Sequence, residues 1–236
     1  MIRGLLWIVA CVAVPAAAHD FWIEPSTFRP EIGKTFSVSL LVGQDFTGDV
    51  VPRSAQLIES FTVRDAGGER SVNGFENQDP AGYVRIDRPG LAIIGYRSKA
   101  NPLELSAEKF NEFVRQEGLG IPPATGPHRE HFFRYAKSIV GRGDGFDQRL
   151  GYRFEIVPET LDGRVRIFFE GKPLANALVT AIHRDDPNAR MSARSDDSGR
   201  VRFALPKNGV WLIKSVHMIQ NRGEWESLWA SLTFER

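Results

Sequence analysis

The sequence contains a single cysteine, Cys11, among its 236 residues. A chain with one cysteine cannot form an internal disulfide, and it offers no pair of thiolates to hold a soft metal ion. Cys11 also lies in an apolar stretch near the start of the chain, which we expect to be removed. Any metal site in the rest of the chain would therefore depend on histidine, methionine, carboxylate or amine ligands.

A charge excess and long apolar runs are absent as well. The 30 basic and 29 acidic side chains give a formal net charge of +1. Because there is no basic excess, the composition does not favour nucleic acid or an anionic membrane as a partner. No stretch after the amino-terminal one approaches the ~20 apolar residues that cross a bilayer. We therefore expect no membrane-spanning segment once the amino-terminal stretch is removed.

Residues 1–18 are typical of a secretory signal peptide. Arg3 supplies the positive charge, residues 5–14 form the apolar core, and Ala16-Ala17-Ala18 fits the signal peptidase pattern. Cleavage after Ala18 would release a periplasmic or secreted protein that begins with His19. In an alternative interpretation Cys11 is lipidated, which would make the protein a lipoprotein, but the apolar core before Cys11 would then be very short.

The rest of the chain is predicted to be mainly β. Apolar residues alternate with polar ones from Phe36 to Val42, and short β-prone runs separated by Gly and Pro turns recur after that. We expect two antiparallel Ig-like or transthyretin-like β-sandwiches, at residues 19–102 and 151–236. Residues 103–150 are predicted to be a helical insert or linker, with one helix from Ala107 to Glu117 capped by Ser106 and a second from His128 to Val140.

His19 is the first candidate for a metal ligand. A terminal histidine offers two nitrogens, its free α-amine and its ring Nδ1, and these suit Ni(II), Co(II) or Cu(II). His217, near the end of a predicted strand, is the candidate for a second ligand. The alternatives are a solvent-exposed terminal histidine without a role and a half-buried His217 bonded to a backbone carbonyl.

His128 and His131 are weaker metal candidates. Their spacing of three residues would place them on one face of the second predicted helix, although two such histidines are more often solvated. Arg129-Glu130 and Arg134 to Lys137 are either a structural set of ion pairs or, less favoured, a general base with an anion clamp. No nucleophile motif or phosphate-binding loop is present, so no catalytic residue and no organic cofactor are predicted.

Four separated motifs resemble the domain-of-unknown-function family DUF4198. They are His19 to Pro25 with Val42 to Phe46, Arg129-Glu130, Arg134 to Lys137, and Trp211 to Met218 with Trp225 to Ser227. The family is loosely labelled NikM-like, which implies a periplasmic component of nickel or cobalt uptake and a membrane transport complex as partner. The carboxyl-terminal half is also similar to carboxypeptidase-regulatory, transthyretin-like sandwiches, in Gly171 to Leu174 and Asp197 to Phe203.

These observations favour a periplasmic, non-enzymatic protein that binds nickel, cobalt or copper for metal uptake or handling. One alternative is an envelope interaction or carbohydrate-binding β-sandwich module without metal, because tryptophans exposed on a sandwich can stack on sugar rings. The other is a copper oxidase with an amino-terminal histidine brace, for which the sequence shows no substrate groove.

Overall fold

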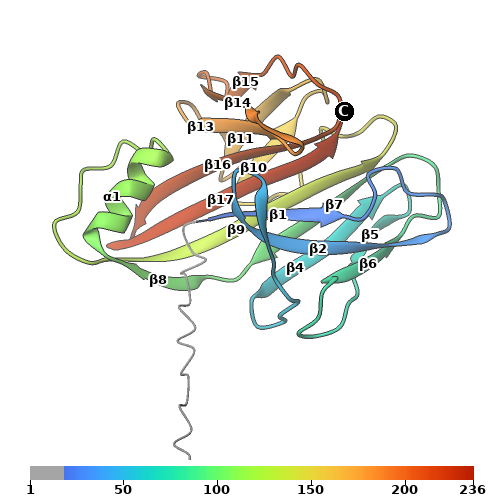
Figure 1. Ribbon diagram of the computed structural model, residues 1–236, viewed down its shortest axis with the longest axis horizontal. Coiled ribbons are helices and arrows are strands. Elements are labelled where there is room, and N and C mark those ends of the chain that lie inside the picture. Colours follow the sequence, from blue (N-terminus) through green and yellow to red (C-terminus); the bar gives the residue numbers. More distant parts are fainter. Residues whose placement is uncertain (1–18) are drawn as a thin grey trace, which may run out of the picture.

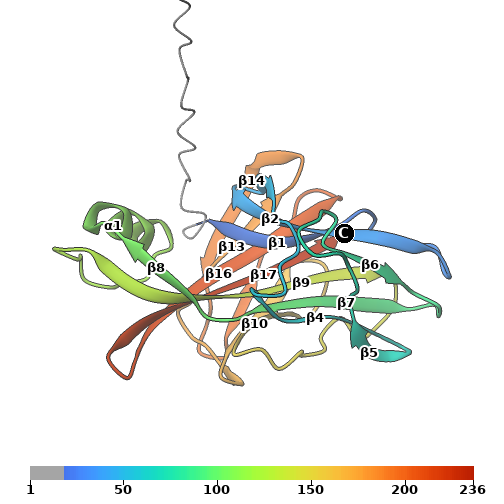
Figure 2. The same cartoon turned by 90° about the horizontal axis from the view of Figure 1, so that it is seen from below.

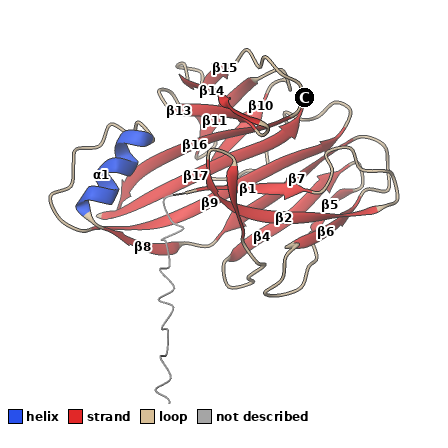
Figure 3. Ribbon diagram, in the orientation of Figure 1, coloured by secondary structure: helices blue, strands red, loops and turns tan. Residues whose placement is uncertain are grey.

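The computed structural model of this protein describes residues 19–236. The predicted signal peptide, its cleavage site and Cys11 lie outside the described residues. Within the described part, strands dominate and one helix is present, so the mainly β prediction is confirmed (Figure 3). No helix between residues 19 and 236 combines the length and the apolar character that a membrane crossing requires.

The central sheet is the largest element of the described chain. In spatial order its strands are β14 (Asp186–Arg194), β13 (Leu178–His183), β16 (Val210–Asn221), β17 (Glu224–Glu235), β9 (His128–Gly141), β7 (Leu91–Ser98), β4 (Ile58–Asp65) and β5 (Gly68–Ser71). Strand β8 (Asn101–Leu105) also pairs with β9. β17 and β9 run parallel, whereas the other described pairings in this sheet are antiparallel. Strands from the predicted segments 19–102 and 151–236 therefore share one sheet.

Two smaller antiparallel sheets complete the described strands. The N-terminal sheet consists of β1 (Asp20–Pro25), β2 (Thr35–Gln44), β3 (Thr47–Val50) and β6 (Gly82–Arg85). The C-terminal sheet consists of β10 (Phe154–Pro158), β11 (Arg164–Phe169), β12 (Lys172–Pro173) and β15 (Arg200–Arg202). Figures 1 and 2 show β1 and β2 crossing over the middle of the central sheet.

The two smaller sheets cover opposite faces of the central sheet. Successive side chains of a strand point to opposite faces, and in β7 Ile94 packs with β1 and β2, whereas its neighbour Ile93 packs with β10 and β11. Leu212 and Ile213 of β16 divide in the same way. Because the middle of the central sheet is buried on both faces, its strands contain nearly continuous apolar runs.

Helix α1 (Ala107–Gln116) covers one end of the central sheet, beside β8 and the ends of β9, β16 and β17 (Figure 1). The first predicted helix is thereby confirmed, and Ser106 caps it by accepting a hydrogen bond from the backbone N–H of Lys109. Phe110 and Phe113 face inward and pack with Met218 and Trp229 of the sheet.

The second predicted helix, from His128 to Val140, is wrong because these residues form the long strand β9. Residues 134–140 are buried on both faces, so their apolar side chains do not alternate with polar ones. The spacing of its apolar residues resembles one face of a helix, and the β-favouring Phe, Tyr, Ile and Val residues fit the strand that is observed. The error matters for the candidate site because it changes which histidines share a face.

Candidate functional site

His19 lies immediately before β1, at the point where the start of this strand contacts β9 of the central sheet. Strand β1 is fixed by its antiparallel pairing with β2, which begins at Asp20 opposite Gly43. The backbone carbonyl of His19 also accepts a hydrogen bond of 2.9 Å from Nη1 of Arg134 on β9. Pairing and hydrogen bond together hold the first described residue in place.

A three-membered ion network adjoins His19. Nζ of Lys214 on β16 lies 2.7 Å from Oδ1 of Asp20 and 2.8 Å from Oε1 of Glu117, the residue that follows α1. Burial alone would lower the pKa of Lys214, but the two carboxylates outweigh burial and raise it. Lys214 therefore remains charged and ties the start of β1 to the end of α1.

Two buried polar atoms beside this network have no hydrogen-bond partner within the described residues. They are Nδ1 of His19 and Oδ2 of Asp20. A buried, unpaired polar group costs about 1–3 kcal/mol, so each such atom calls for a reason, such as a bound ion or a water molecule. Both residues line a polar cavity of about 170 Å³, together with Gln44, Gln116, Glu117, Arg190 and Lys214.

The donor set of this cavity suits a borderline metal ion. After cleavage at Ala18, His19 would present its α-amine and Nδ1, and the carboxylate of Asp20 lies beside them. Nitrogen donors with a carboxylate are ligands that Cu(II), Ni(II) and Co(II) accept. Residues 19–236 contain no group of three or more His, Cys, Asp or Glu side chains placed to hold a metal.

The structure does not bring His217 to His19. His217 and Lys214 are three residues apart on β16, so their side chains point to opposite faces of the central sheet. Lys214 bonds Asp20, the neighbour of His19, on one face of the central sheet. On the other face, the ring centre of the half-buried His217 lies 4.7 Å from that of Phe169. Burial and the Arg153 guanidinium lower the pKa of His217, so its ring is neutral at pH 7.

His128 and His131 do not share a face, contrary to the helical expectation, because an odd spacing on a strand separates them. His128 lies beneath α1, stacked at 3.6 Å on the ring of Phe110, and its Nε2 is 3.1 Å from Oε2 of Glu130. Ser227 donates a hydrogen bond of 2.5 Å to the other oxygen of Glu130. Burial raises the pKa of Glu130 to about 7, against the opposing effect of Ser227.

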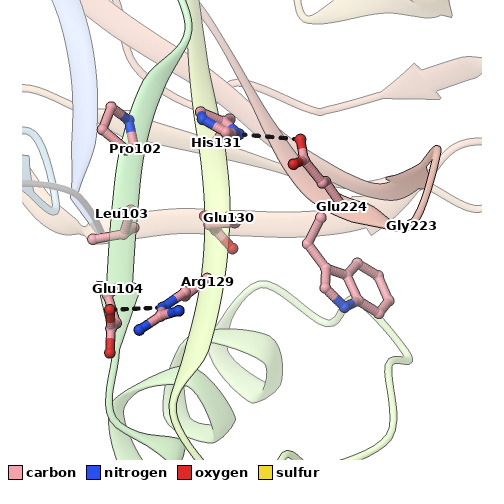
Figure 4. A pocket seen from close by; sticks show the side chains of 9 residues that line it. Pro102, Leu103, Glu104, Arg129, Glu130, His131, Gly223 and Glu224 are labelled. Carbon is pink, nitrogen blue, oxygen red and sulfur yellow. Dashed lines mark hydrogen bonds and ion pairs between the residues drawn. The ribbon is translucent and has the colours of Figure 1, made fainter.

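His131 faces the other way, into an open trough of about 490 Å³ at the ends of β8, β9 and β17 (Figure 4). Its Nδ1 lies 3.8 Å from Glu224, and Arg129 lies 2.8 Å from Glu104. Both pairs are exposed, and such pairs contribute about 0–1 kcal/mol. The side chain of Glu130 belongs to the opposite face, so the trough presents two weak ion pairs and no convergent donor set.

The remaining residues of the β9 motif lie in two settings. Nζ of Lys137 forms a fully buried ion pair of 3.0 Å with Glu155 of β10, which joins the central sheet to the C-terminal sheet. Arg134 is buried among the rings of Phe21, Phe132 and Trp229. These contacts favour the structural interpretation of the motif for Lys137, whereas Arg134 contacts the His19 backbone directly.

Two further observations concern the aromatic and histidine residues. Trp22, Trp211 and Trp229 are buried in the core and Trp225 is half-buried, so these tryptophans do not form an exposed stacking surface. Both ring nitrogens of His183 are engaged, Nε2 with the carbonyl of Asn208 and Nδ1 with the N–H of Asp185.

The sequence profile of the family described as "Domain of unknown function (DUF4198)" matches residues 16–219. The chain belongs to the DUF4198 family. No curated protein matches the chain. A solved structure titled "D0-D1 domain of Intimin" is 12% identical, with 91% of this chain and 97% of that chain covered, and its TM-score of 0.20 supports no argument about fold or function.

Membership of DUF4198 confirms the resemblance that the four motifs indicated, and the match includes both His19 and His217. The NikM-like label and the transthyretin-like likeness stay predictions. Sequence reasoning missed Lys214 and Glu117. A signal for Lys214 was present, because a lysine inside the apolar strand Trp211 to Val216 requires a buried partner. Glu117 had no such signal, since it was expected only as the end of a surface helix.

Proposed function

We propose that this member of DUF4198 is a periplasmic metal-binding protein, and that His19 holds the metal once the signal peptide has been removed. The metal is Cu(II), Ni(II) or Co(II), bound as cargo for uptake or handling rather than for a reaction. The observation that carries the proposal is the buried Nδ1 of His19, which has no partner among the described residues, on a residue that lines a polar cavity.

The ligands would be the α-amine and Nδ1 of His19, with Oδ2 of Asp20 as the third donor. A metal at this place would satisfy both unpaired atoms, and it would contact Asp20 on the side away from Lys214. His217 has no part in this site because it lies on the other face of the central sheet. The proposal thus keeps the terminal chelate and replaces the expected second histidine with a carboxylate.

The decisive experiment compares the processed protein, which begins at His19, with a variant that has four extra glycines before His19. The extension carries the α-amine away from Nδ1 and leaves every side chain in place, whereas a single glycine would form a new chelate from its own amine, the Gly-His19 amide and Nδ1. We expect calorimetric titration with Cu(II), Ni(II) and Co(II) to show at least about a hundredfold weaker binding of the preferred metal by the extended protein, the size of losing one strong ligand. Equal affinity of the two proteins would refute the proposal.

Two histidine variants serve as matched controls. His217→Gln and His131→Gln each remove an imidazole outside the proposed site, and we expect both to bind metal as the unaltered protein does. Loss of binding in His217→Gln with full binding in the glycine-extended protein would instead support a site around His217.

A second candidate function is an envelope module that binds glycans without metal. Phe75 and Tyr83 favour it, because these rings are 63% and 41% exposed and lie 6.5 Å apart beside a polar cavity that includes Ser26 and Ser37. Exposed rings next to hydroxyl groups suit a sugar. This function would be supported if the unaltered protein bound to an immobilised polysaccharide column while Phe75→Ala and Tyr83→Ala passed into the flow-through.

A further inference from the structure

An apolar cavity lies between the N-terminal sheet and the central sheet, separate from the polar cavity at His19. It has a volume of about 280 Å³, near the lower end of the ~300–1,000 Å³ range of ligand pockets. Phe21 of β1, Tyr96 of β7 and Phe132 of β9 form aromatic parts of its wall, and the exposed Leu57 lies at its rim. Its size and lining restrict a ligand to a small molecule with an apolar body.

One charged side chain, Arg134, lines this cavity. Its guanidinium lies 5.1 Å from the ring centre of Phe21 and 5.2 Å from that of Phe132. A guanidinium stays charged at neutral pH even inside a protein. This guanidinium also donates a hydrogen bond to the backbone carbonyl of His19, and its planar set of N–H donors is matched in shape to a carboxylate.

We propose that this cavity binds a small monocarboxylate with an apolar aromatic or alkyl body, with the carboxylate directed at Arg134 and the body between Phe21, Tyr96 and Phe132. Apolar walls with one convergent charged group are the usual composition of a small-molecule site. The ring centres of Phe21 and Tyr96 lie 4.9 Å apart with the rings tilted, so both present aromatic surface that a flat ring or a short chain can contact.

The first test is calorimetric titration of the metal-free, processed protein with benzoate and with benzyl alcohol, which has the same ring and no charge. We expect benzoate to bind roughly tenfold more tightly or more, as one hydrogen bond to a charged group predicts. Equal binding of the two compounds, or binding of neither, would overturn the proposal. Because metal is absent, neither outcome bears on the proposed function.

Variants at the rim locate the binding without disturbing the core. Leu57→Glu places a negative charge at the mouth of the cavity, and we expect it to weaken benzoate binding by roughly tenfold. Leu57→Lys changes the same side chain to the opposite charge and should bind benzoate at least as well as the unaltered protein. Ile32→Glu, at a residue 49% exposed that does not line the cavity, is the matched control.

Arg134→Gln tests the charge directly and should abolish the preference for benzoate over benzyl alcohol. Arg134 is buried, so this variant can fail to fold, and the Leu57 pair then decides the question. Equal benzoate affinity in Leu57→Glu, Leu57→Lys and Ile32→Glu would show that the compound binds elsewhere and would refute the proposal.

Discussion

Lys214 holds the candidate site together at the scale of single residues. It contacts Asp20 at the start of β1 and Glu117 at the end of α1, and its side chain is buried. Breaking a buried ion pair from one side is costly because the remaining charges lose their partner in a poorly hydrated place. This network, rather than any histidine pair, fixes the surroundings of His19.

Lys214→Met should destabilise the protein by roughly 3–5 kcal/mol at pH 7.5, because two carboxylates would be left without their cation. Burial already raises the pKa of Asp20 in the folded state, and Lys214 opposes that rise. In Lys214→Met the pKa of Asp20 should therefore rise further above its value in the unfolded state. The folded state then binds more protons, so the loss should be smaller at pH 5. Urea unfolding at the two pH values measures this.

The exposed Lys172→Met is the control for that substitution, and we expect it to change stability by less than about 0.5 kcal/mol. An equal loss in Lys214→Met at pH 5 and pH 7.5 would contradict the electrostatic explanation.

Part of the site could be predicted from single residues. The cleavage pattern predicts His19 as the first residue of the processed protein, and the structure places His19 at a polar cavity. In the ion network, Lys214 is 194 positions from Asp20 and 97 positions from Glu117 in the sequence. No local pattern encodes such a meeting, because it depends on which faces of three distant elements are packed together.

At the scale of elements, α1 and β9 show the two outcomes of sequence reasoning. The Ser106 cap and the one-sided apolar pattern of α1 are local signals, and the helix was predicted correctly. β9 is buried on both sides by other sheets, and that burial removes the alternation by which a strand is normally detected. The layers around β9 come from residues far from it in sequence, so its type could not be predicted from its own pattern.

The contact between α1 and β9 predicts a pH-dependent stability centred on Glu130. Burial raises the pKa of this carboxyl to about 7 from its ordinary value of 4.5, so the folded state holds a proton that the unfolded state releases. Stability from Glu130 is therefore complete below about pH 4.5 and declines as the pH rises to about 7, by roughly 3 kcal/mol in total. His128 opposes this trend because burial lowers its pKa.

Glu130→Gln isolates the contribution of the carboxyl. The difference in unfolding free energy between Glu130→Gln and the unaltered protein should shift in favour of the variant between pH 4.5 and pH 7.5, as measured by denaturant titration. Glu104→Gln, on the neighbouring strand and exposed, should show no such shift. A pH-independent difference for Glu130→Gln would contradict the assignment.

At the scale of the whole molecule, the central sheet contains strands from both halves of the described chain. β7 and β4 come from the first half and β13, β16 and β17 from the second, with β9 between the two groups. The pairing of β17 with β9 extends over residues 225–234 and supplies a long row of hydrogen bonds. If either group of strands were removed, the other would be left with an unpaired strand edge.

We therefore expect residues 19–236 to unfold as one cooperative unit. Denaturant curves followed by circular dichroism and by tryptophan fluorescence should coincide, since Trp22 lies on the N-terminal sheet and Trp211 on the central sheet. Two separated transitions would show instead that residues 19–102 and 151–236 form independent sandwiches.

The position of β17 has a consequence for the time at which the protein can fold. β17 is the last strand of the described chain, yet it lies inside the central sheet, between β16 and β9. Thr233 on β17 also donates a hydrogen bond to the carbonyl of Ile23 on β1, 210 residues earlier. During synthesis the earlier strands cannot complete their pairing until β17 is available, so the central sheet forms fully only after residues 224–235 have left the ribosome. Closure through such distant pairings is slow, which leaves the emerging chain unfolded for longer and open to helper proteins that recognise unfolded segments.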